Sequence, residues 1–238
     1  MNLAIIIIIL LLGFFIFNLN ETFDNMSTGN TYIFYHIFCN QYTLPVVKDQ
    51  INKIIYSGLY NNCTKIYCFF TGEEQYIKLC IDYVKKCGNK FLIEDIGVND
   101  KTYERFTLLK IKKYIKSNDK FLYLHSKGIT KQNNQYVTDW RNVMEYFLIY
   151  KFKDCLKELD EYDTIGINYI EKMHYSGNFW WTKGSYYMKL ADTIPDYYIA
   201  PENHILTGNP KIKNRYSTKL EGMGHYTNLY PMINYTDL

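Results

Sequence analysis

The sequence predicts an α/β fold, a single domain around a mostly parallel central sheet that is preceded by an N-terminal hydrophobic helix. Two observations predict the sheet. Short apolar runs alternate four times with segments of helical periodicity, which is typical of parallel strands joined by right-handed crossovers. The chain has 238 residues, of which 47% are hydrophobic, and this is enough for one α/β domain with a full core.

Four buried strands are predicted in the first half of the domain, at residues 32–39, 65–70, 91–93 and 121–124. Each is a short apolar run closed by polar or turn residues. The first is followed by a helix that opens at Thr43 and Pro45, and the second by a helix that ends at Gly88. The third is followed by helical periodicity over residues 104–115. A sheet of this kind binds ligands at the carboxyl ends of its strands.

The second half of the chain has a different pattern, with longer helical segments and fewer strands. A long helix is predicted over about residues 135–159, a strand over 164–168 and a tyrosine-rich helix near 184–192. A short helix is predicted to begin at Pro201. The two halves therefore differ in architecture but continue one predicted domain.

An uncharged apolar segment occupies residues 3–17. Its 15 residues are slightly fewer than the roughly 17–25 of a membrane-spanning helix, and uncharged neighbours extend it. We predict a transmembrane signal anchor at residues 1–19 and a linker at residues 20–30, hence a single-pass membrane protein whose domain is lumenal or external. A cleaved signal peptide and a buried core element are the alternatives.

The composition argues against some classes of function. The net charge is only +3, and no run of basic residues is interleaved with aromatics, so a nucleic-acid partner is not expected. The six cysteines include no Cys-x-x-Cys pair, which disfavours a zinc site and leaves disulfides open. The 25 tyrosines accompany abundant Lys, Ile and Asn, a bias that AT-rich codons produce, so isolated aromatics are given no weight as sugar-binding residues.

The most informative segment is the end of the fourth predicted strand, where an apolar run gives way to His125, Ser126, Lys127 and Gly128. These residues supply positive charge and a hydroxyl at a strand end, and the glycine lets the backbone turn or approach a bound group. This chemistry suits an anionic leaving group such as a nucleotide diphosphate. A solvated turn after a core strand is the alternative interpretation.

Five blocks of the chain carry a family resemblance. They are Tyr103-Glu104 with Thr107-Leu108, residues 123–130, Trp140-Arg141, residues 174–181, and Pro201-Glu202. In this order they resemble glycosyltransferases of giant viruses and some bacteria that have a GT-A-like fold. The similarity covers roughly residues 31–230, and the paired His-Ser-Lys-Gly and Gly-Asn-Phe-Trp-Trp motifs are its most specific part.

The resemblance implies a GT-A-like (Rossmann-like) domain at residues 31–238, with a nucleotide-binding half at 31–130 and an acceptor-binding half at 131–238. It implies transfer of a sugar from a nucleotide-sugar donor, used as co-substrate, to a glycan, lipid or protein acceptor. It also implies a viral or host endomembrane as the location.

The chain departs from the GT-A pattern at one point. Enzymes of that fold carry Asp-any-Asp at this strand end to hold Mn²⁺ or Mg²⁺. Here His125, Ser126 and Lys127 take that place, so a divalent metal is uncertain, and His125 and His225 are only weak candidate ligands. We expect Lys127 to meet the diphosphate charge directly.

Several residues are predicted to bind the donor. Lys127 is the leaving-group cation, and His125 is a hydrogen-bond donor or metal ligand. The other candidates are Ser126, Asp95, Glu104, Arg141 and His225. Each of three has a plain alternative: Asp95 is an exposed strand-end acid, Arg141 forms an ordinary surface ion pair, and His225 is a histidine in an exposed tail.

The Gly-Asn-Phe-Trp-Trp motif predicts a sugar- or acceptor-binding shelf. Its residues are Gly177, Asn178, Phe179, Trp180 and Trp181. Flat rings suit the C–H faces of a sugar, and an amide suits its hydroxyls. At least one of the two tryptophans is expected in the core instead.

Glu202 is the candidate general base, because sugar transfer with inversion needs a carboxylate to take the proton of the acceptor hydroxyl. Its alternative role is to stabilise the start of a helix. We therefore predict a hexosyltransferase-like glycosyltransferase with Glu202 and Lys127 as catalytic residues. A non-catalytic carbohydrate- or nucleotide-sugar-binding membrane protein with the same fold is the alternative, favoured by the missing acidic pair. A structural viral membrane protein is the weaker third possibility.

Overall fold

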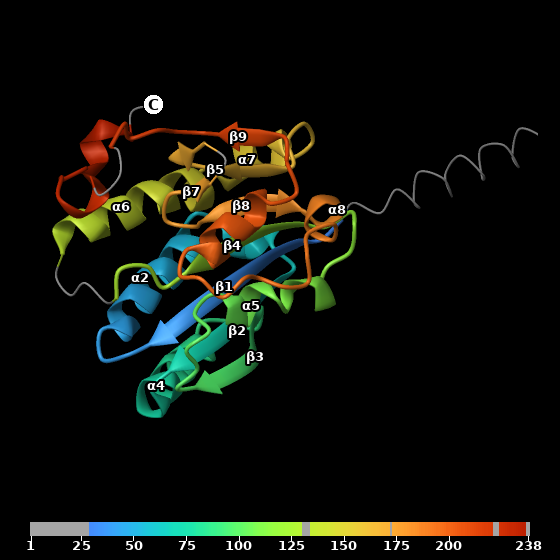
Figure 1. The fold of residues 1–238 in the computed structure, drawn as a ribbon. Coiled ribbons are helices and arrows are strands. Elements are labelled where there is room, and N and C mark those ends of the chain that lie inside the picture. Colours follow the sequence, from blue (N-terminus) through green and yellow to red (C-terminus); the bar gives the residue numbers. More distant parts are fainter. Residues whose placement is uncertain (1–28, 130–133, 172, 221–223, 237–238) are drawn as a thin grey trace, which may run out of the picture.

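The structure is a computed structural model that describes residues 29–129, 134–171, 173–220 and 224–236. It contains a seven-stranded sheet in the order β3-β2-β1-β4-β8-β5-β9, with β3 at one edge and β9 at the other (Figure 1). The strands are β1 (Thr31–Cys39), β2 (Lys65–Gly72), β3 (Phe91–Val98), β4 (Lys120–His125), β5 (Thr164–Gly166), β8 (Trp180–Lys183) and β9 (Ile212–Asn214).

The sheet is mostly parallel, as the alternation of strands and helices predicts. Strands β3, β2, β1 and β4 run in the same direction. Strand β8 runs antiparallel to both β4 and β5, and β9 is parallel to β5. The four predicted strands of the first half are all present, and β3 extends beyond its predicted end to Val98.

The strand order reverses between β1 and β4. After β1 the chain builds outward through β2 to β3, and it then returns to place β4 on the other side of β1. The ends of the two strands are in register, so that His36 pairs with His125. Such a topological switch point opens a crevice at the carboxyl ends of the strands, and ligands bind there in open α/β sheets.

Helices cover both faces of the sheet. They are α2 (Thr43–Tyr56), α3 (Leu59–Asn62), α4 (Glu74–Val84), α5 (Arg105–Leu108), α6 (Gln135–Glu145), α7 (Phe152–Glu158), α8 (Gly184–Tyr187) and α9 (Ala200–Asn203). Alternate residues of β1 belong to two separate cores: Ile33 and Tyr35 pack with α2, α4 and α6, whereas Tyr32 and Phe34 pack with the segments around α5 and α8. The sheet is therefore the middle layer of three.

Helical periodicity overestimates the length of three helices. The helix predicted at 135–159 is split by a π-helical turn, η2 (Tyr146–Tyr150), between α6 and α7. The periodic segment at 104–115 forms only α5 and the 3₁₀ helix η1 (Ile111–Lys113), and α8 ends at Tyr187. Leu108 and Ile111 are nevertheless buried, so packing against the sheet, not helix continuity, explains the apolar spacing.

One other predicted element differs in the second half. The strand predicted at 164–168 ends at Gly166 in β5. A small antiparallel two-stranded sheet follows, formed by β6 (Tyr169–Ile170) and β7 (His174–Tyr175).

The predicted membrane location needs correction. Among the residues that the structure describes, no helix is both long and apolar enough to cross a bilayer, so the single-pass membrane prediction is not upheld. The predicted signal anchor at 1–19, and the linker up to residue 28, lie outside the described residues.

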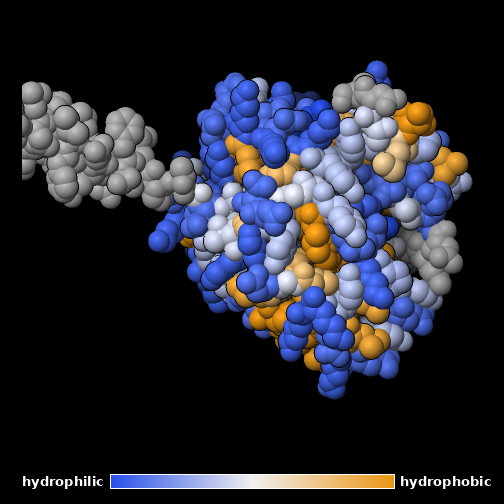
Figure 2. Space-filling view, turned by 180° about the vertical axis from the view of Figure 1, so that it is seen from behind, coloured by the Kyte–Doolittle hydropathy of each residue, from blue (hydrophilic) through white to orange (hydrophobic). Residues whose placement is uncertain are grey.

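The face turned away from the view of Figure 1 is mainly hydrophilic, as Figure 2 shows. Hydrophobic residues reach this surface in patches in its middle and lower parts. Apolar atoms contribute much of the surface of any folded protein, so these patches do not by themselves indicate a binding site.

Candidate active site

A cavity of about 250 Å³ opens at the carboxyl ends of β1 and β4. Five residues that the sequence analysis selected line it: Glu104, His125, Ser126, Lys127 and Glu202. They come from the end of β4, the turn before α5, and α9. The cavity thus lies at the switch point of the sheet, and it brings the predicted cation and the predicted base together.

Lys127 supplies positive charge to this cavity. Its Nζ lies 3.8 Å from the centroid of the Trp140 ring, and the ring of His225 stacks on Trp140 with centroids 4.6 Å apart. Burial lowers the pKa of Lys127, and the charges of Glu202 and Glu104 oppose this shift. Within the described ranges, Nζ has no carboxylate oxygen within 4.0 Å, so its N–H groups are available to an added anion.

Two buried side chains fix the backbone around Lys127. Gln50 Nε2 donates to the His125 carbonyl at 3.2 Å, and Arg141 Nη1 donates to the Lys127 carbonyl at 2.9 Å. Both side chains also contact Glu145. Gln50 Nε2 donates to Glu145 Oε1 at 2.9 Å, and Arg141 Nε lies 3.6 Å from the same oxygen. A buried charged network therefore supports the end of β4 from behind.

Ser126 and Gly128 shape the same turn. Ser126 Oγ accepts from the Phe38 backbone N–H at 3.0 Å, which ties the end of β4 to the end of β1. Gly128 has φ +92°, and a Cβ there would lie 2.7 Å from a methyl carbon of Val137. A side chain at this position is excluded both by the left-handed backbone and by the packing of α6.

Two neutral histidines lie side by side in the cavity wall. Burial lowers the pKa of both His36 and His125 to about 3, and the Lys127 charge adds to the shift of His125. His125 Nε2 lies 3.0 Å from the Gly177 carbonyl oxygen, so this nitrogen carries the proton. His36 Nδ1 lies 2.8 Å from Thr107 Oγ1. Neither imidazole adds positive charge at neutral pH.

Glu104 is a buried carboxylate with two donors on one oxygen. Its Oε2 accepts from the Tyr123 hydroxyl at 2.9 Å and from the Asn178 amide. Its Oε1 lies 3.6 Å from His125 Nε2. Burial raises the pKa of Glu104, although both donors and the Lys127 charge act in the opposite direction. The carboxylate is therefore held in one orientation at the edge of the cavity.

Glu202 lies in α9, directly after Pro201 in the first turn. Its Oε2 lies 3.6 Å from His174 Nε2, and His174 Nδ1 lies 3.2 Å from Asn203 Oδ1. The Glu202 side chain retains 27% exposure, so one carboxylate opens to the cavity while a histidine stands behind it.

The predicted aromatic shelf does not face the cavity. Phe179, Trp180 and Trp181 are almost completely buried in the sheet. Trp181 Nε1 donates to the Leu148 carbonyl at 2.8 Å, and Trp180 Nε1 donates to Asn178 Oδ1 at 2.7 Å. The motif contributes to the cavity indirectly, because the same Asn178 amide holds Glu104.

Three other predicted donor-binding residues also lie outside the cavity lining. Asp95 Oδ2 forms an ion pair with Lys110 at 2.7 Å. His225 is buried beneath Trp140, and its Nε2 lies 2.9 Å from Thr218 Oγ1. Arg141 is buried as well, and it supports the Lys127 backbone as described above.

The residues at the end of β4 do not fit a divalent metal. In the part of the chain that the structure describes, no group of three or more His, Cys, Asp or Glu residues could hold one. Lys127 is a cation, and Nε2 of both His125 and His225 is engaged by neighbouring polar atoms. Mn²⁺ and Mg²⁺ prefer carboxylate oxygens, so we derive no step through a metal here.

Some residues of the cavity were missed by sequence reasoning. His36, Tyr103, Tyr198 and Tyr226 line it beside the predicted residues. His36 stands within an apolar strand, and only its place near the strand end hinted at a role. Tyr198 and Tyr226 were hidden by the large number of tyrosines in the chain, and Tyr103 was recognised only as part of a family block and not as a binding residue.

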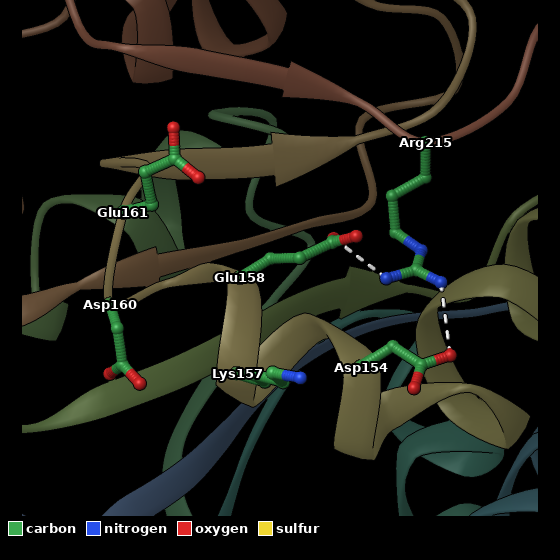
Figure 3. Close-up of a pocket in the computed structure, with 6 residues that line it drawn as sticks. All are labelled: Asp154, Lys157, Glu158, Asp160, Glu161 and Arg215. Carbon is green, nitrogen blue, oxygen red and sulfur yellow. Dashed lines mark hydrogen bonds and ion pairs between the residues drawn. The ribbon is translucent and has the colours of Figure 1, made fainter.

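A larger hollow of about 700 Å³ lies between α7 and the segment after β9 (Figure 3). Its lining is entirely charged. Arg215 contacts Glu158 at 2.7 Å and Asp154 at 3.2 Å, as the dashed lines in Figure 3 mark. Asp160 and Glu161 form ion pairs with Lys120 and Lys211, which lie outside the lining. Ion pairs of this kind are common on exposed surfaces and do not by themselves indicate a ligand site.

The fold has distant similarities among solved structures. It matches 4-diphosphocytidyl-2C-methyl-D-erythritol synthase from Anaerococcus prevotii with a TM-score of 0.47 and 8% identity, over 86% of this chain and 94% of that one. It matches HddC from Yersinia pseudotuberculosis with a TM-score of 0.46 and 11% identity, over 79% and 90%. Similarities this weak do not bear on what the chain binds.

The sequence comparisons are more decisive about the family. No curated protein matches the chain. The domain family of unknown function DUF8361 matches residues 34–228, which include both strand ends of the cavity, the 177–181 motif and α9. The chain belongs to the DUF8361 family.

Proposed function

We propose that this protein is a glycosyltransferase with a GT-A-like fold, which moves a sugar from a nucleotide-sugar donor to an acceptor hydroxyl. One observation carries the proposal: Lys127, Glu104 and Glu202 face one cavity at the switch point of the sheet. A cation and two carboxylates that converge at this place are suited to an anionic leaving group and a proton transfer.

In the proposed reaction, the acceptor oxygen forms a bond to the anomeric carbon as the bond from that carbon to the diphosphate oxygen breaks. The acceptor proton passes to Glu202, and the bonding electrons leave with the diphosphate. Lys127 offsets the charge that develops on the leaving group. The contact with Trp140 and the hydrogen bond to the Lys127 carbonyl orient the ammonium, and no side chain among the described residues forms an ion pair with it that the diphosphate must displace.

The size of the cavity limits what it holds. About 250 Å³ is below the roughly 300–1,000 Å³ of pockets that enclose a whole small ligand. We therefore assign the cavity to the diphosphate and the reacting sugar carbon, with the nucleoside outside it.

The test uses the full-length chain and a panel of nucleotide-sugars, with released nucleotide as the readout, in the presence and absence of Mn²⁺. We expect release with at least one donor, and release without Mn²⁺ would agree with Lys127 as the counter-charge. If no donor is bound or cleaved, the proposal is wrong. Binding without cleavage would instead support the non-catalytic module, which the missing acidic pair at β4 favours.

Glu202→Gln separates binding from chemistry. The amide keeps the shape of the side chain but does not accept the proton, so we expect nearly normal donor binding and a loss of transfer of about 100-fold or more. Asp160→Asn, an exposed acid outside the cavity, is the matched control. Transfer at the normal rate in Glu202→Gln would exclude Glu202 as the base.

A further inference from the structure

Two exposed tyrosines stand at the mouth of the cavity, where the buried tryptophans do not reach. Tyr103 is 54% exposed and Tyr198 is 83% exposed, and both line the cavity. Their rings meet edge to face, with centroids 6.1 Å apart and planes at 81°. Large aromatic rings left open to solvent beside a polar cavity are typical of recognition surfaces.

A buried arginine holds these two rings together. Arg105 is 8% exposed, and its Nη2 donates to the carbonyls of Pro195 at 2.6 Å and Tyr197 at 2.5 Å. The loop before α9, which carries Tyr198, is thereby fixed to α5 immediately after Tyr103. The ring pair is therefore a built surface and not a chance meeting of two flexible side chains.

The backbone at Tyr103 supports the same conclusion. Its φ is +54°, in the left-handed region that a bulky residue rarely adopts and that costs about 1 kcal/mol or more. This conformation lets two consecutive side chains, Tyr103 and Glu104, both line the cavity. Strain of this kind persists where the surrounding structure enforces it, and it is concentrated at ligand-binding sites.

We propose that Tyr103 and Tyr198 form the acceptor subsite and that the acceptor is a saccharide. This inference rests on the proposed glycosyltransferase function. Tyr198 and Glu202 line the same cavity, so a sugar that stacks on the Tyr198 ring enters the cavity that holds the proposed base. The nucleobase of the donor is the rival occupant of these rings, and the donor KM measured below distinguishes it from the acceptor.

The chemistry of the pair favours a sugar ring over other acceptors. A sugar presents C–H faces that pack on aromatic rings and hydroxyls that bond to tyrosine O–H and to carboxylates. Glu104 and Glu202 supply those carboxylates within the same cavity. A peptide or a polyprenol is the rival acceptor, and the experiment below includes both.

The experiment measures the KM of the acceptor separately from the KM of the donor, with the full-length chain. The probes are methyl glycosides and short oligosaccharides, with a peptide and a polyprenol as rival acceptors. In Tyr198→Ala we expect the KM for the saccharide to rise about tenfold, more than any change in the donor KM, because a stacking contact is lost. Tyr198→Phe keeps the ring and should retain most of the affinity.

Tyr56→Ala is the matched control, since Tyr56 is 79% exposed at the end of α2 and does not line the cavity. Calorimetric titration of the same saccharides gives a second readout that needs no turnover. Saccharide binding lost in Tyr198→Ala without nucleotide release in the wild type would support the subsite and refute the glycosyltransferase. An unchanged saccharide KM, a raised donor KM, preference for the peptide or polyprenol, or a wild type that binds no saccharide would each overturn the subsite.

Discussion

The two most distinctive segments of the chain lie next to each other, but one lines the cavity and the other is buried in the core. Residues 125–128 form the end of β4 and the turn after it. Residues 177–181 form the turn before β8 and the first two residues of β8, which pairs antiparallel with β4. Both combine glycine, a polar side chain and groups suited to ligand binding. Lys127 opens into the cavity, whereas Trp180 and Trp181 are completely buried.

Burial, not residue type, distinguishes the two segments. Trp180 packs on Tyr123 with centroids 4.9 Å apart and planes at 25°, so it joins the end of β4 to β8. The Asn178 amide then connects this core to Glu104. The comparison shows that one motif lines the candidate site while its neighbour packs in the core and supports a residue of that site.

The largest expected effect is on stability, from Trp180→Ala. Removing a fully buried indole leaves a cavity in the core and should lower the free energy of unfolding by about 3–5 kcal/mol. Chemical denaturation of the variant checks this value. The exposed Tyr198→Ala is the control and should change stability by about 0.5 kcal/mol or less. A loss of only about 0.5 kcal/mol in Trp180→Ala would mean that residues 177–181 do not stabilise the structure around residues 125–128.

The second effect is on activity, from Lys127→Met. Methionine keeps the packing on Trp140 but removes the charge, so nucleotide release should fall about 10²–10³-fold while stability stays close to normal. Steady-state kinetics with the donor found in the panel, together with denaturation, checks both parts. The ion-paired Lys110→Met, which lies outside the cavity, is the matched control. Near-normal release would remove Lys127 from the proposed mechanism.

The strands of the first half could be predicted because strands buried on both faces consist of continuous apolar runs. Phe121, Leu122 and Leu124 are all inaccessible to solvent, as a strand covered on both faces requires. The helices were predicted less well. Leu108 and Ile111 keep a helical spacing, but packing against the sheet imposes a short helix and a 3₁₀ turn instead.

Without the family resemblance, the residues that line the candidate site could be predicted only where they follow the end of a buried strand. Lys127 and His125 could be found because residues after a parallel strand lie at the ligand edge of the sheet. Asp95 was selected by the same rule, but β3 continues to Val98, so Asp95 lies within an edge strand and not at a strand end. The contact between Tyr103 and Tyr198 could not be predicted, because it depends on the hydrogen bonds of Arg105 to a loop 90 residues away.

The smallest expected effect concerns the bond that joins the two segments, between His125 Nε2 and the Gly177 carbonyl. Burial and the Lys127 charge lower the pKa of His125 to about 3. NMR of the imidazole nitrogens should therefore show a neutral ring, protonated on Nε2, throughout pH 8 to 5. The pKa of His125 is lower in the folded protein than in the unfolded chain, where it is about 6.5. His125 therefore reduces the free energy of unfolding only as the pH falls below about 6.5, and the loss is about 2 kcal/mol at pH 5.

Lys127→Met sharpens this test, since it removes one of the causes of the shift and leaves the burial. The pKa of His125 should rise in the variant but stay below its ordinary value, because burial is the larger cause. Half-protonation of His125 near pH 6.5 in the wild type would show that water reaches the joint between the segments. The bond between His125 and Gly177 would then not be buried, and the distinction between the open segment 125–128 and the buried segment 177–181 would be wrong at this contact.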